Sequence, residues 1–503
     1  MKSNIKFILL IALTFSFTGC DQEEFLTIPP ETQPSSATFF TNEGDFEQAV
    51  NAAYVPLRTI INDRAWLLSE MRSDNTYYAR NPLFGATEQQ EDIADFALPS
   101  DNGVTSNVHV LNQYRLDYLI IARTNQILDL IDDVEFTSGE ELKNNIKGQA
   151  LFLRAYAYFE LVRYFGSVPL HLVPVPNRDE AAQPLASEED IYAQIIDDVS
   201  AAVQLVPSKS EQEPGRVTSG AAKTLLANVY IRQEQWAQAE TLLQEVVNSN
   251  EYALMPNYDD AFSTSTGNKN NMESVFEVQF LEGSAGLSGN FINAFMPRDI
   301  TAEELGSITG TSNPQPLSGE GNNIPTPDII NAYEDGDQRE EFSIGYITLS
   351  NSPWRDGEYP YIKKFARPHS LHGNHGMNWP IYRYSEVLLF LAEAKAEQGK
   401  IGEAAVYLNM VRNRAGLGDY SGDIIEAIYH ERWVELAFEN KRWHDLVRTG
   451  RAVEIMTAFG NRVFENPQDY YYPEGSEPRG HAFSNITVKY PLPAGEAALT
   501  PHF

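Results

Sequence analysis

Cysteine, basic residues and long apolar runs are all scarce in this sequence. Its 503 residues contain one cysteine, Cys20, so no disulfide can form within the chain. Lys and Arg number 37 against 70 Asp and Glu, and the resulting net charge of −33 would repel a phosphate backbone. No stretch approaches the ~20 apolar residues that a membrane-spanning helix needs. The chain is therefore predicted to bind no nucleic acid and to be no integral membrane transporter.

The sequence does contain enough apolar residues for a large folded core. Hydrophobic residues make up 42% of the chain and aromatic residues 11%, a composition unlike that of disordered chains. The length corresponds to about three domains of ordinary size, although scaffolds of helical repeats exceed that size as one unit. We therefore expect a folded protein with a sizeable interior.

The N-terminus has the features of a secretory signal. Residues 1–19 combine a positively charged start with an apolar core of signal-peptide length, and Cys20 follows Gly19 directly. A small residue before cysteine resembles the bacterial lipobox, in which the thiol is acylated after the signal is removed. The alternative is a chance cysteine near an ordinary cleavage site. The acid-rich residues 21–24 are similar to the export signal of surface lipoproteins in Bacteroidetes, or form a solvated tether.

Several segments have the spacing of amphipathic helices. In Asp45–Ile61 the apolar residues fall on one side, and Pro56 is expected to bend or shorten the end of the helix. Val108–Ile131 repeats the pattern. Glu140–Phe165 is apolar nearly all round, which predicts a buried helix, and Gly166 supplies its C-terminal stop.

Two later stretches share the same spacing of small and large residues. The matching positions are Ala227, Trp236, Ala239 and Leu243 in the first and Ala392, Ile401, Ala404 and Leu408 in the second. Small residues where two helices cross, with a large residue opening the second helix, are typical of tetratricopeptide units, whose period is about 34 residues. The sequence therefore predicts a mainly α fold of tetratricopeptide-like helix pairs, an α-α superhelix.

The helical pattern lapses between Asn257 and Pro380. Gly, Ser, Asn and Pro there separate short strand-like pieces, such as those at 274–280 and 359–365. We expect an irregular, loop-rich region with a few short strands, braced on the helices and carrying the binding site. The predicted division is a signal peptide at 1–19, a lipidated cysteine and tether at 20–44, an N-terminal helical scaffold at 45–256, the insert at 257–380, and a C-terminal helical scaffold at 381–503 that packs on the first.

Three long motifs stand out in the helical regions. They are Arg154–Leu170 (RAYAYFELVRYFGSVPL), Arg383–Ala394 (RYSEVLLFLAEA) and Glu431–Gly450 (ERWVELAFENKRWHDLVRTG). With the lipobox, they resemble the SusD/RagB family of nutrient-uptake outer-membrane lipoproteins over nearly the whole chain. The resemblance implies four tetratricopeptide-like helix pairs and a lipoprotein that sits as a lid over a SusC-like TonB-dependent barrel. The chain ends in Leu499–Phe503 rather than in the Asn-Pro and Gln-Asn-Pro tail usual in the family.

A glycan site needs aromatic faces for stacking and polar forks for paired hydrogen bonds, because sugars present both apolar CH faces and hydroxyls. Aromatic residues in or beside loops, and polar residues near them, are therefore the candidates. The predicted ligand-binding residues are Trp66, Asp74, Asn75, Tyr77, Trp354, Tyr361, Trp379 and Arg383. The alternatives are core packing for the aromatics, a capped turn at 74–75, and a bond from Arg383 to a buried carboxylate. Trp236, Trp433 and Trp443 fall in helical patterns and are assigned to the core.

No catalytic constellation and no cofactor motif is predicted. The acids of Glu431–Gly450 have helical spacing and are interpreted as structural ion pairs, since paired carboxylates for glycoside hydrolysis must face each other across a cleft. His369, His372 and His375 recur every third residue, but the glycines among them favour a flexible polar loop over a zinc site. The acidic turn at 335–337 lacks EF-hand spacing. We expect no metal and no cofactor.

These observations favour a non-enzymatic surface lipoprotein of the outer membrane. It is predicted to capture an oligosaccharide, preferably a neutral one given the net charge of −33, and to deliver it to a SusC-like TonB-dependent transporter. Its lipid anchor would hold it on the membrane facing the cell exterior. Three alternatives stay open: a surface glycoside hydrolase, an assembly adaptor that binds no sugar, and a peptide-binding member of the same family.

Overall fold

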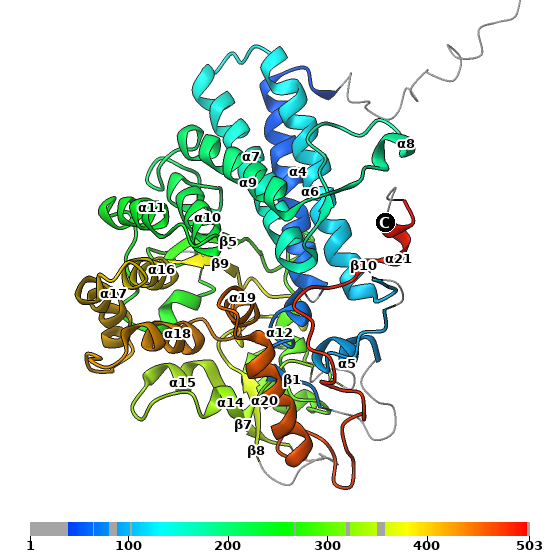
Figure 1. Cartoon of the computed structure of the whole chain (residues 1–503), viewed down its shortest axis with the longest axis vertical. Helices are drawn as coiled ribbons and strands as arrows, with labels where there is room; N and C mark the ends of the chain where they lie inside the picture. Colours follow the sequence, from blue (N-terminus) through cyan, green and yellow to red (C-terminus); the bar gives the residue numbers. More distant parts are fainter. Residues whose placement is uncertain are drawn as a thin grey trace, which may run out of the picture.

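The computed structural model describes residues 39–63, 65–79, 88–100, 103–265, 268–317, 322–349 and 358–499. Cys20 and Trp354 lie outside these ranges. Long helices dominate the fold (Figure 1). Their bounds are α4 Glu43–Asn62, α6 Val108–Leu130, α7 Glu140–Phe165, α9 Glu188–Leu205, α10 Ser219–Arg232, α11 Trp236–Asn248, α16 Tyr384–Ala396, α17 Ile401–Arg414, α18 Ile424–Glu435, α19 Arg442–Arg448 and α20 Ala452–Glu465.

The N-terminal helices lie within a residue or two of their predicted bounds. α7 spans the predicted range, is buried on almost every side, and ends at Gly166, whose φ of 78° favours glycine. α4 differs from the prediction, because the helix continues past Pro56 to Asn62. Proline has no N–H to donate to the Ala52 carbonyl, and Arg123 of α6 donates to that oxygen instead, at 2.5 Å. The neighbouring helix thus satisfies the group that proline leaves free.

The helix pairs α10–α11 and α16–α17 confirm the predicted repeat. The small and aliphatic repeat residues Ala227, Ala239, Leu243, Ala392, Ala404 and Leu408 are fully buried. Trp236 opens α11 and Ile401 opens α17, at the predicted places. α11 packs against α16, and α16 packs against α18, so the pairs form a continuous tetratricopeptide-like stack on the left side of Figure 1. The mainly α fold is therefore confirmed.

Short two-stranded sheets join distant parts of the chain. β5 (Ser274–Val278) pairs antiparallel with β9 (Trp379–Arg383), and β7 (Ile344–Thr348) pairs with β8 (Glu358–Ile362). The remaining strands are β1 Thr76–Tyr77 with β6 Ile324–Pro325, β2 Val104–Thr105 with β10 Leu492–Pro493, and β3 Val168–Pro169 with β4 Leu185–Ala186. The shorter helices are α5 Glu88–Ala94, α8 Arg178–Ala181, α12 Phe291–Ala294, α13 Ala302–Thr309, α14 Pro327–Ile330, α15 Gln338–Ser343 and α21 Ala494–Ala497, with 3-10 turns η1 Ala65–Leu68, η2 Ile131–Asp133 and η3 Tyr258–Phe262.

One buried cluster of apolar side chains runs through the helices and the strand-bearing region alike. Since β9 continues directly into α16, the sheet β5–β9 ties that region to the repeat stack. Within the described ranges, no helix combines the length and apolarity required to cross a membrane. The predicted division at residues 256 and 380 stays a prediction.

Candidate functional site

Two of the predicted ligand contacts are tryptophans that lie inside the protein. Trp66 is fully buried and meets the ring of Phe295 edge-on, with 5.2 Å between ring centroids. Trp379 on β9 is 1% exposed and stacks on Phe365 at 4.9 Å. A buried indole cannot offer its face to a sugar, so the expectation that these two side chains form exposed stacking platforms is wrong. Each lies beside a loop in sequence, yet long-range packing places it in the core.

Tyr77 and Tyr361 are also buried. The Tyr77 hydroxyl donates a short hydrogen bond to Asp95, which accepts another from Tyr78 at 2.9 Å. Tyr361 of β8 lies against Gly345 of β7, where an added Cβ would come within 2.3 Å of the Tyr361 ring. Both tyrosines support the structure from within, and the expectation that they reach a ligand is corrected accordingly.

Arg383 is the centre of a buried charge network rather than an exposed polar fork. Its guanidinium contacts Glu273, Glu435 and Glu439 at 2.5, 2.9 and 2.8 Å. Burial acts to raise the pKa of Glu435, but neighbouring arginines, first among them Arg414, outweigh it and hold that pKa well below its usual range. The acids of the motif Glu431–Gly450 therefore form structural ion pairs, as predicted. Arg383 binds buried carboxylates, which was the alternative to its predicted contact with a ligand.

Asp74 and Asn75 meet Trp433 and Arg442, which lie far away in sequence. The Arg442 guanidinium donates two hydrogen bonds to Asp74, at 2.7 and 2.8 Å, and lies 3.9 Å from the Trp433 ring centroid. The Trp433 indole N–H donates to Asn75 Oδ1 at 2.5 Å, and Asn75 Nδ2 donates to Glu70 at 2.9 Å. Because an indole nitrogen can only donate, this chain fixes the orientation of the Asn75 amide. Asp74 and Asn75 are both buried, and their hydrogen bonds hold the side chains of Arg442 and Trp433 in position from the protein interior.

Glu70 anchors the inner end of this hydrogen-bond chain. It is fully buried, and its two oxygens accept N–H groups from Asn75 and from the backbone of Asn440, the latter at 2.5 Å. Burial raises the pKa of Glu70 to about 7, while these two hydrogen bonds oppose the rise. The group that holds Asn75 in place therefore titrates near neutral pH.

A hollow of about 210 Å³ opens beside Trp433, between α18, α19 and α20. Tyr429 and Trp433 line it, one helical turn apart on α18, and both are partly exposed. We call it the α18 hollow; its other lining residues are Glu426, His430, Arg442, Asp445, Leu446, Thr449, Arg451 and Ile455. Sites that enclose a whole ligand measure about 300–1,000 Å³, so the α18 hollow suits one unit of a longer chain.

The titratable groups of the α18 hollow suit binding better than proton transfer. Burial acts to raise the pKa of Asp445, but Arg432 and Arg448 outweigh it and lower the pKa to about 2. A hydrogen bond from Arg451 lowers the pKa of Glu426. Both carboxylates are thus ionised at neutral pH, whereas a glycosidase needs a carboxylic acid that still carries its proton. Neither can serve as the general acid.

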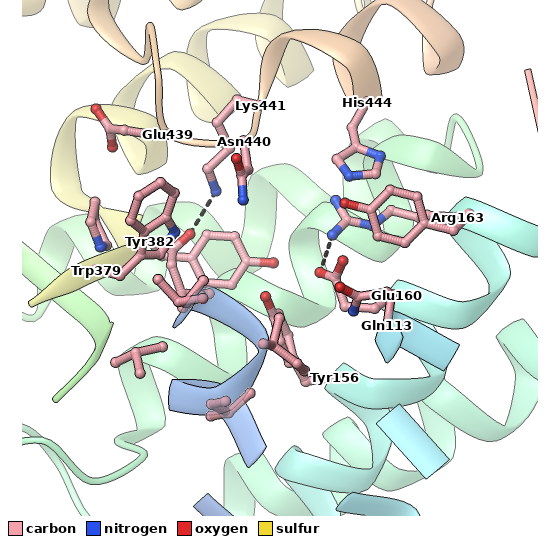
Figure 2. Close-up of a pocket in the computed structure, with 17 residues that line it drawn as sticks. Gln113, Tyr156, Glu160, Arg163, Trp379, Tyr382, Glu439, Asn440, Lys441 and His444 are labelled. Atoms are coloured by element: carbon pink, nitrogen blue, oxygen red, sulfur yellow. Dashed lines mark hydrogen bonds and ion pairs between the residues drawn. The ribbon is translucent and has the colours of Figure 1, made fainter. Parts of the chain in front are cut away.

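A cavity of about 50 Å³ lies deeper in the protein, between α4, α6, α7 and β9 (Figure 2). Figure 2 shows Glu160 and Arg163 paired on one side and Lys441 and Asn440 on the other. The Asn440 Oδ1 and Arg163 Nε atoms are buried without a hydrogen-bond partner among the described residues. One ordered water needs about 10–15 Å³ of such space, so this cavity has room for a few ordered waters and is too small for a sugar.

A third hollow, of about 460 Å³, lies between α6, the segment 169–181 and α21. We call it the α6 groove. Its wall includes Tyr118, Arg115 and His171 together with Val173 and Val175, which are 64% and 42% exposed. Exposed branched aliphatic side chains favour an apolar or peptide ligand over a sugar ring.

The three histidines of the insert do not surround a common point for a metal. His375 is 1% exposed, with its ring 4.5 Å from that of Phe291, and burial holds its pKa well below the usual range. His369 lies 5.8 Å from it, ring to ring, and His372 contacts Asn293. In the described part of the chain, no group of three or more His, Cys, Asp or Glu side chains could hold a metal ion. The acidic turn is used internally, because Asp337 pairs with Arg339 at 2.7 Å.

Sequence reasoning missed Tyr429 and Trp433 as a partly exposed pair. Trp433 was assigned to the core with Trp236 and Trp443, yet only Trp443 is fully buried. A usable signal was present, since Tyr429 and Trp433 stand four residues apart, on one face of the helix that carries the last motif.

The sequence matches two family profiles and several known proteins. The profile of the SusD family matches residues 338–502, and a second profile, described as starch-binding associating with outer membrane, matches residues 25–231. A SusD-like protein of Formosa agariphila is 26% identical over 98% of this chain and 96% of its own length. A SusD-like protein of Bacteroides ovatus is 27% identical over 92% of this chain and 85% of its own.

Solved structures share the fold. A SusD homologue from Bacteroides thetaiotaomicron has a TM-score of 0.75 at 21% identity, covering 94% of this chain and 98% of that one. A laminarin-binding SusD-like protein has a TM-score of 0.71 at 24% identity over 92% and 100%. Surface glycan-binding protein A from Bacteroides thetaiotaomicron, solved with laminarihexaose, has a TM-score of 0.70 at 19% identity over 91% and 95%.

Proposed function

The chain belongs to the SusD family, and from this premise we propose that it is a surface glycan-binding lipoprotein of the outer membrane. It captures an oligosaccharide without cleaving it and delivers it to a SusC-like TonB-dependent transporter. The family description that names outer-membrane association and the lipobox at Cys20 support this location. The lipid on Cys20 would anchor the protein with its folded part facing the exterior.

The observation that carries the proposal is the aromatic pair in the α18 hollow. Tyr429 and Trp433 lie partly exposed on one side of a helix, and the guanidiniums of Arg451 and Arg442 stack on one face of these rings, 4.5 and 3.9 Å from the ring centroids. Ring faces with polar forks are what a sugar unit requires. Buried Asp74 and Asn75 hold Arg442 and Trp433 in place, so the surface is organised before a ligand arrives.

The charge pattern supports a neutral glycan. Arg442 and Arg451 are paired with Asp74 and Glu426, so the α18 hollow has little free positive charge for a sulfated or uronic-acid-rich chain. The net charge of −33 would repel such a chain at longer range. Among the structural neighbours, one is described as laminarin-binding and another was solved with laminarihexaose.

The test is the affinity of the purified protein, from Asp21 onward, for neutral and acidic oligosaccharides by isothermal titration calorimetry. We expect binding of a neutral glucan oligosaccharide and no new reducing ends. Tyr429→Ala should weaken binding at least tenfold, about 1.4 kcal/mol, because an aromatic in a binding centre usually contributes that much or more. Tyr420→Ala is the matched control, since Tyr420 is 36% exposed and lies outside the α18 hollow. Equal affinity in both variants would refute the placement of the site.

A second candidate is peptide capture in the α6 groove. The exposed side chains of Val173 and Val175 favour an extended apolar peptide, since Arg115 beside them is already paired with Glu496. A mixed peptide library in the same calorimetric panel distinguishes the two functions. Peptide binding that Val173→Asp abolishes and Tyr429→Ala leaves intact would establish this second function.

A further inference from the structure

One buried carboxylate supports both sides of the α18 hollow. Glu70 is fully buried just after η1, and each of its two oxygens accepts one N–H group. The first N–H belongs to the Asn75 amide, which in turn holds Trp433. The second is the backbone N–H of Asn440, two positions before Arg442. Glu70 therefore connects the aromatic side of the hollow with the side that carries a guanidinium.

The first connection runs through Asn75 and fixes the Trp433 indole. Glu70 accepts from Asn75 Nδ2 at 2.9 Å, and Asn75 Oδ1 accepts the indole N–H at 2.5 Å. A carboxylate can only accept and an indole nitrogen can only donate, so these two groups select one of the two orientations of the amide. The indole N–H keeps its partner only while Asn75 stays in that orientation.

The second connection holds the turn between α18 and α19. Glu70 accepts the backbone N–H of Asn440, a residue that Figure 2 labels, at 2.5 Å. Phe438 and Asn440 in this turn have φ of 70° and 62°, left-handed conformations that cost free energy for residues other than glycine. Such a turn persists where other contacts stabilise it, and α19 begins at Arg442 directly after it. The bond to Glu70 thus helps to place Arg442.

A proton on Glu70 would leave one of these two N–H groups without a full acceptor. The ionised carboxylate offers one oxygen to each N–H, whereas the protonated carboxyl has one full acceptor oxygen and a hydroxyl that donates. Burial raises the pKa of Glu70 to about 7, so both forms are present near neutral pH. The two sides of the hollow are held together only in the ionised form.

The charged groups that face Glu70 keep most of their charge in this range. They are Lys364 and Glu439, which pair with each other at 2.7 Å. Burial lowers the pKa of Lys364 to about 8. Burial acts to raise the pKa of Glu439, but Arg383 and Lys364 outweigh it and lower that pKa. Of these three groups, Glu70 is therefore the one that changes its charge between pH 6 and pH 7.5.

We propose that Glu70 is a positioning residue that couples ligand binding in the α18 hollow to the release of a proton. This inference rests on the proposed glycan-binding function of that hollow. A ligand on the hollow needs Trp433 and Arg442 in place, so it binds best when Glu70 is ionised. Since linkage is reciprocal, the bound ligand favours loss of the Glu70 proton to the solvent. The protein captures its ligand at neutral pH and holds it more weakly in acid.

Calorimetric titration of the purified protein with laminarihexaose at pH 6 and pH 7.5 tests this coupling. The ionised fraction of a group with a pKa of about 7 rises about eightfold between these pH values, so the affinity should rise by up to about eightfold. Titrations at pH 7 in phosphate and in Tris, which differ in their heats of ionisation, should show the release of about half a proton for each ligand bound.

Glu70→Gln keeps the shape of the side chain and offers one acceptor oxygen at every pH. It should bind as weakly as wild type at pH 6, with no gain at pH 7.5 and no proton release. Glu213→Gln, at an exposed carboxylate on the surface, is the matched control and should behave as wild type. His430 also lines the hollow and is present in every variant. A pH dependence that persists in Glu70→Gln would therefore arise elsewhere and overturn the proposal.

The proton-release measurement uses wild type alone, so it decides the question even if Glu70→Gln folds poorly. Equal wild-type affinity at pH 6 and pH 7.5, without proton release, would overturn the coupling and leave glycan binding established. No binding of laminarihexaose at either pH would count against the proposed function, and the inference would fall with it.

Discussion

Glu70 makes the stability of this protein depend on pH in a direction that can be worked out. Burial raises its pKa from 4.5 to about 7. Between these values the folded state holds a proton that the unfolded state has lost, so the free energy of unfolding falls as pH rises. Well above pH 7, the ionised and buried carboxylate lowers the free energy of unfolding by about 3 kcal/mol in total, at about 1.4 kcal/mol for each unit of difference between the two pKa values. About 2 kcal/mol of it develops between pH 5.5 and pH 8.5.

Glu70→Gln removes the titration while keeping the shape of the side chain. The amide has one full acceptor oxygen, as the protonated carboxyl of Glu70 has below pH 7, so it accepts from Asn75 or from the Asn440 backbone but not from both. The variant should therefore gain about 2 kcal/mol of unfolding free energy on wild type between pH 5.5 and pH 8.5.

Urea unfolding followed by tryptophan fluorescence at both pH values measures this difference. Other titrating groups are common to the two proteins and cancel. Glu213→Gln, at a 75% exposed side chain on the surface, is the control and should show no such change with pH. If wild type and variant differ in unfolding free energy by the same amount at pH 5.5 and pH 8.5, the pKa of Glu70 is not raised in the folded protein. The two N–H donors would then outweigh the effect of burial on that pKa, and the reasoning would be refuted.

Two further substitutions test the corrected assignments by urea unfolding and calorimetry together. Trp379→Ala should lower the free energy of unfolding by about 3–5 kcal/mol, because the indole packs between aromatic rings. Glycan affinity should stay within twofold. A loss of affinity without a loss of stability would show that Trp379 contacts the ligand after all. Arg383→Gln leaves three buried carboxylates short of a partner and should lower the free energy of unfolding by about 3–5 kcal/mol. Arg216→Gln breaks a surface ion pair and should lower it by less than about 1 kcal/mol. Equal losses in the two variants would contradict the buried network.

The helices could be predicted because their determinants are local. Apolar spacing and a glycine stop placed α7 at Glu140–Phe165, and the shared steps of small residues identified the pairs α10–α11 and α16–α17. The continuation of α4 past Pro56 could not be predicted in this way. It depends on Arg123, a residue of another helix, which satisfies the Ala52 carbonyl.

The site depends on contacts between distant segments, which is why only part of it could be predicted. Asp74 and Asn75 were recognised as polar loop residues, but their partners Trp433 and Arg442 lie more than 350 positions away. Trp379 was expected at the surface because it follows a loop, whereas the pairing of β9 with β5 turns it into the core. Local composition identifies the kinds of residue a glycan site needs, and only tertiary packing decides which of them reach the surface.

The structure of the protein with a bound neutral glucan oligosaccharide tests the central claim most directly. Laminarihexaose is a suitable probe, since a structural neighbour was solved with it. The account predicts an intact oligosaccharide with a sugar ring against Tyr429 and Trp433 and hydroxyls within hydrogen-bond distance of Arg442 or Arg451. An oligosaccharide ordered elsewhere, for example in the α6 groove, or a cleaved product in the α18 hollow, would contradict it.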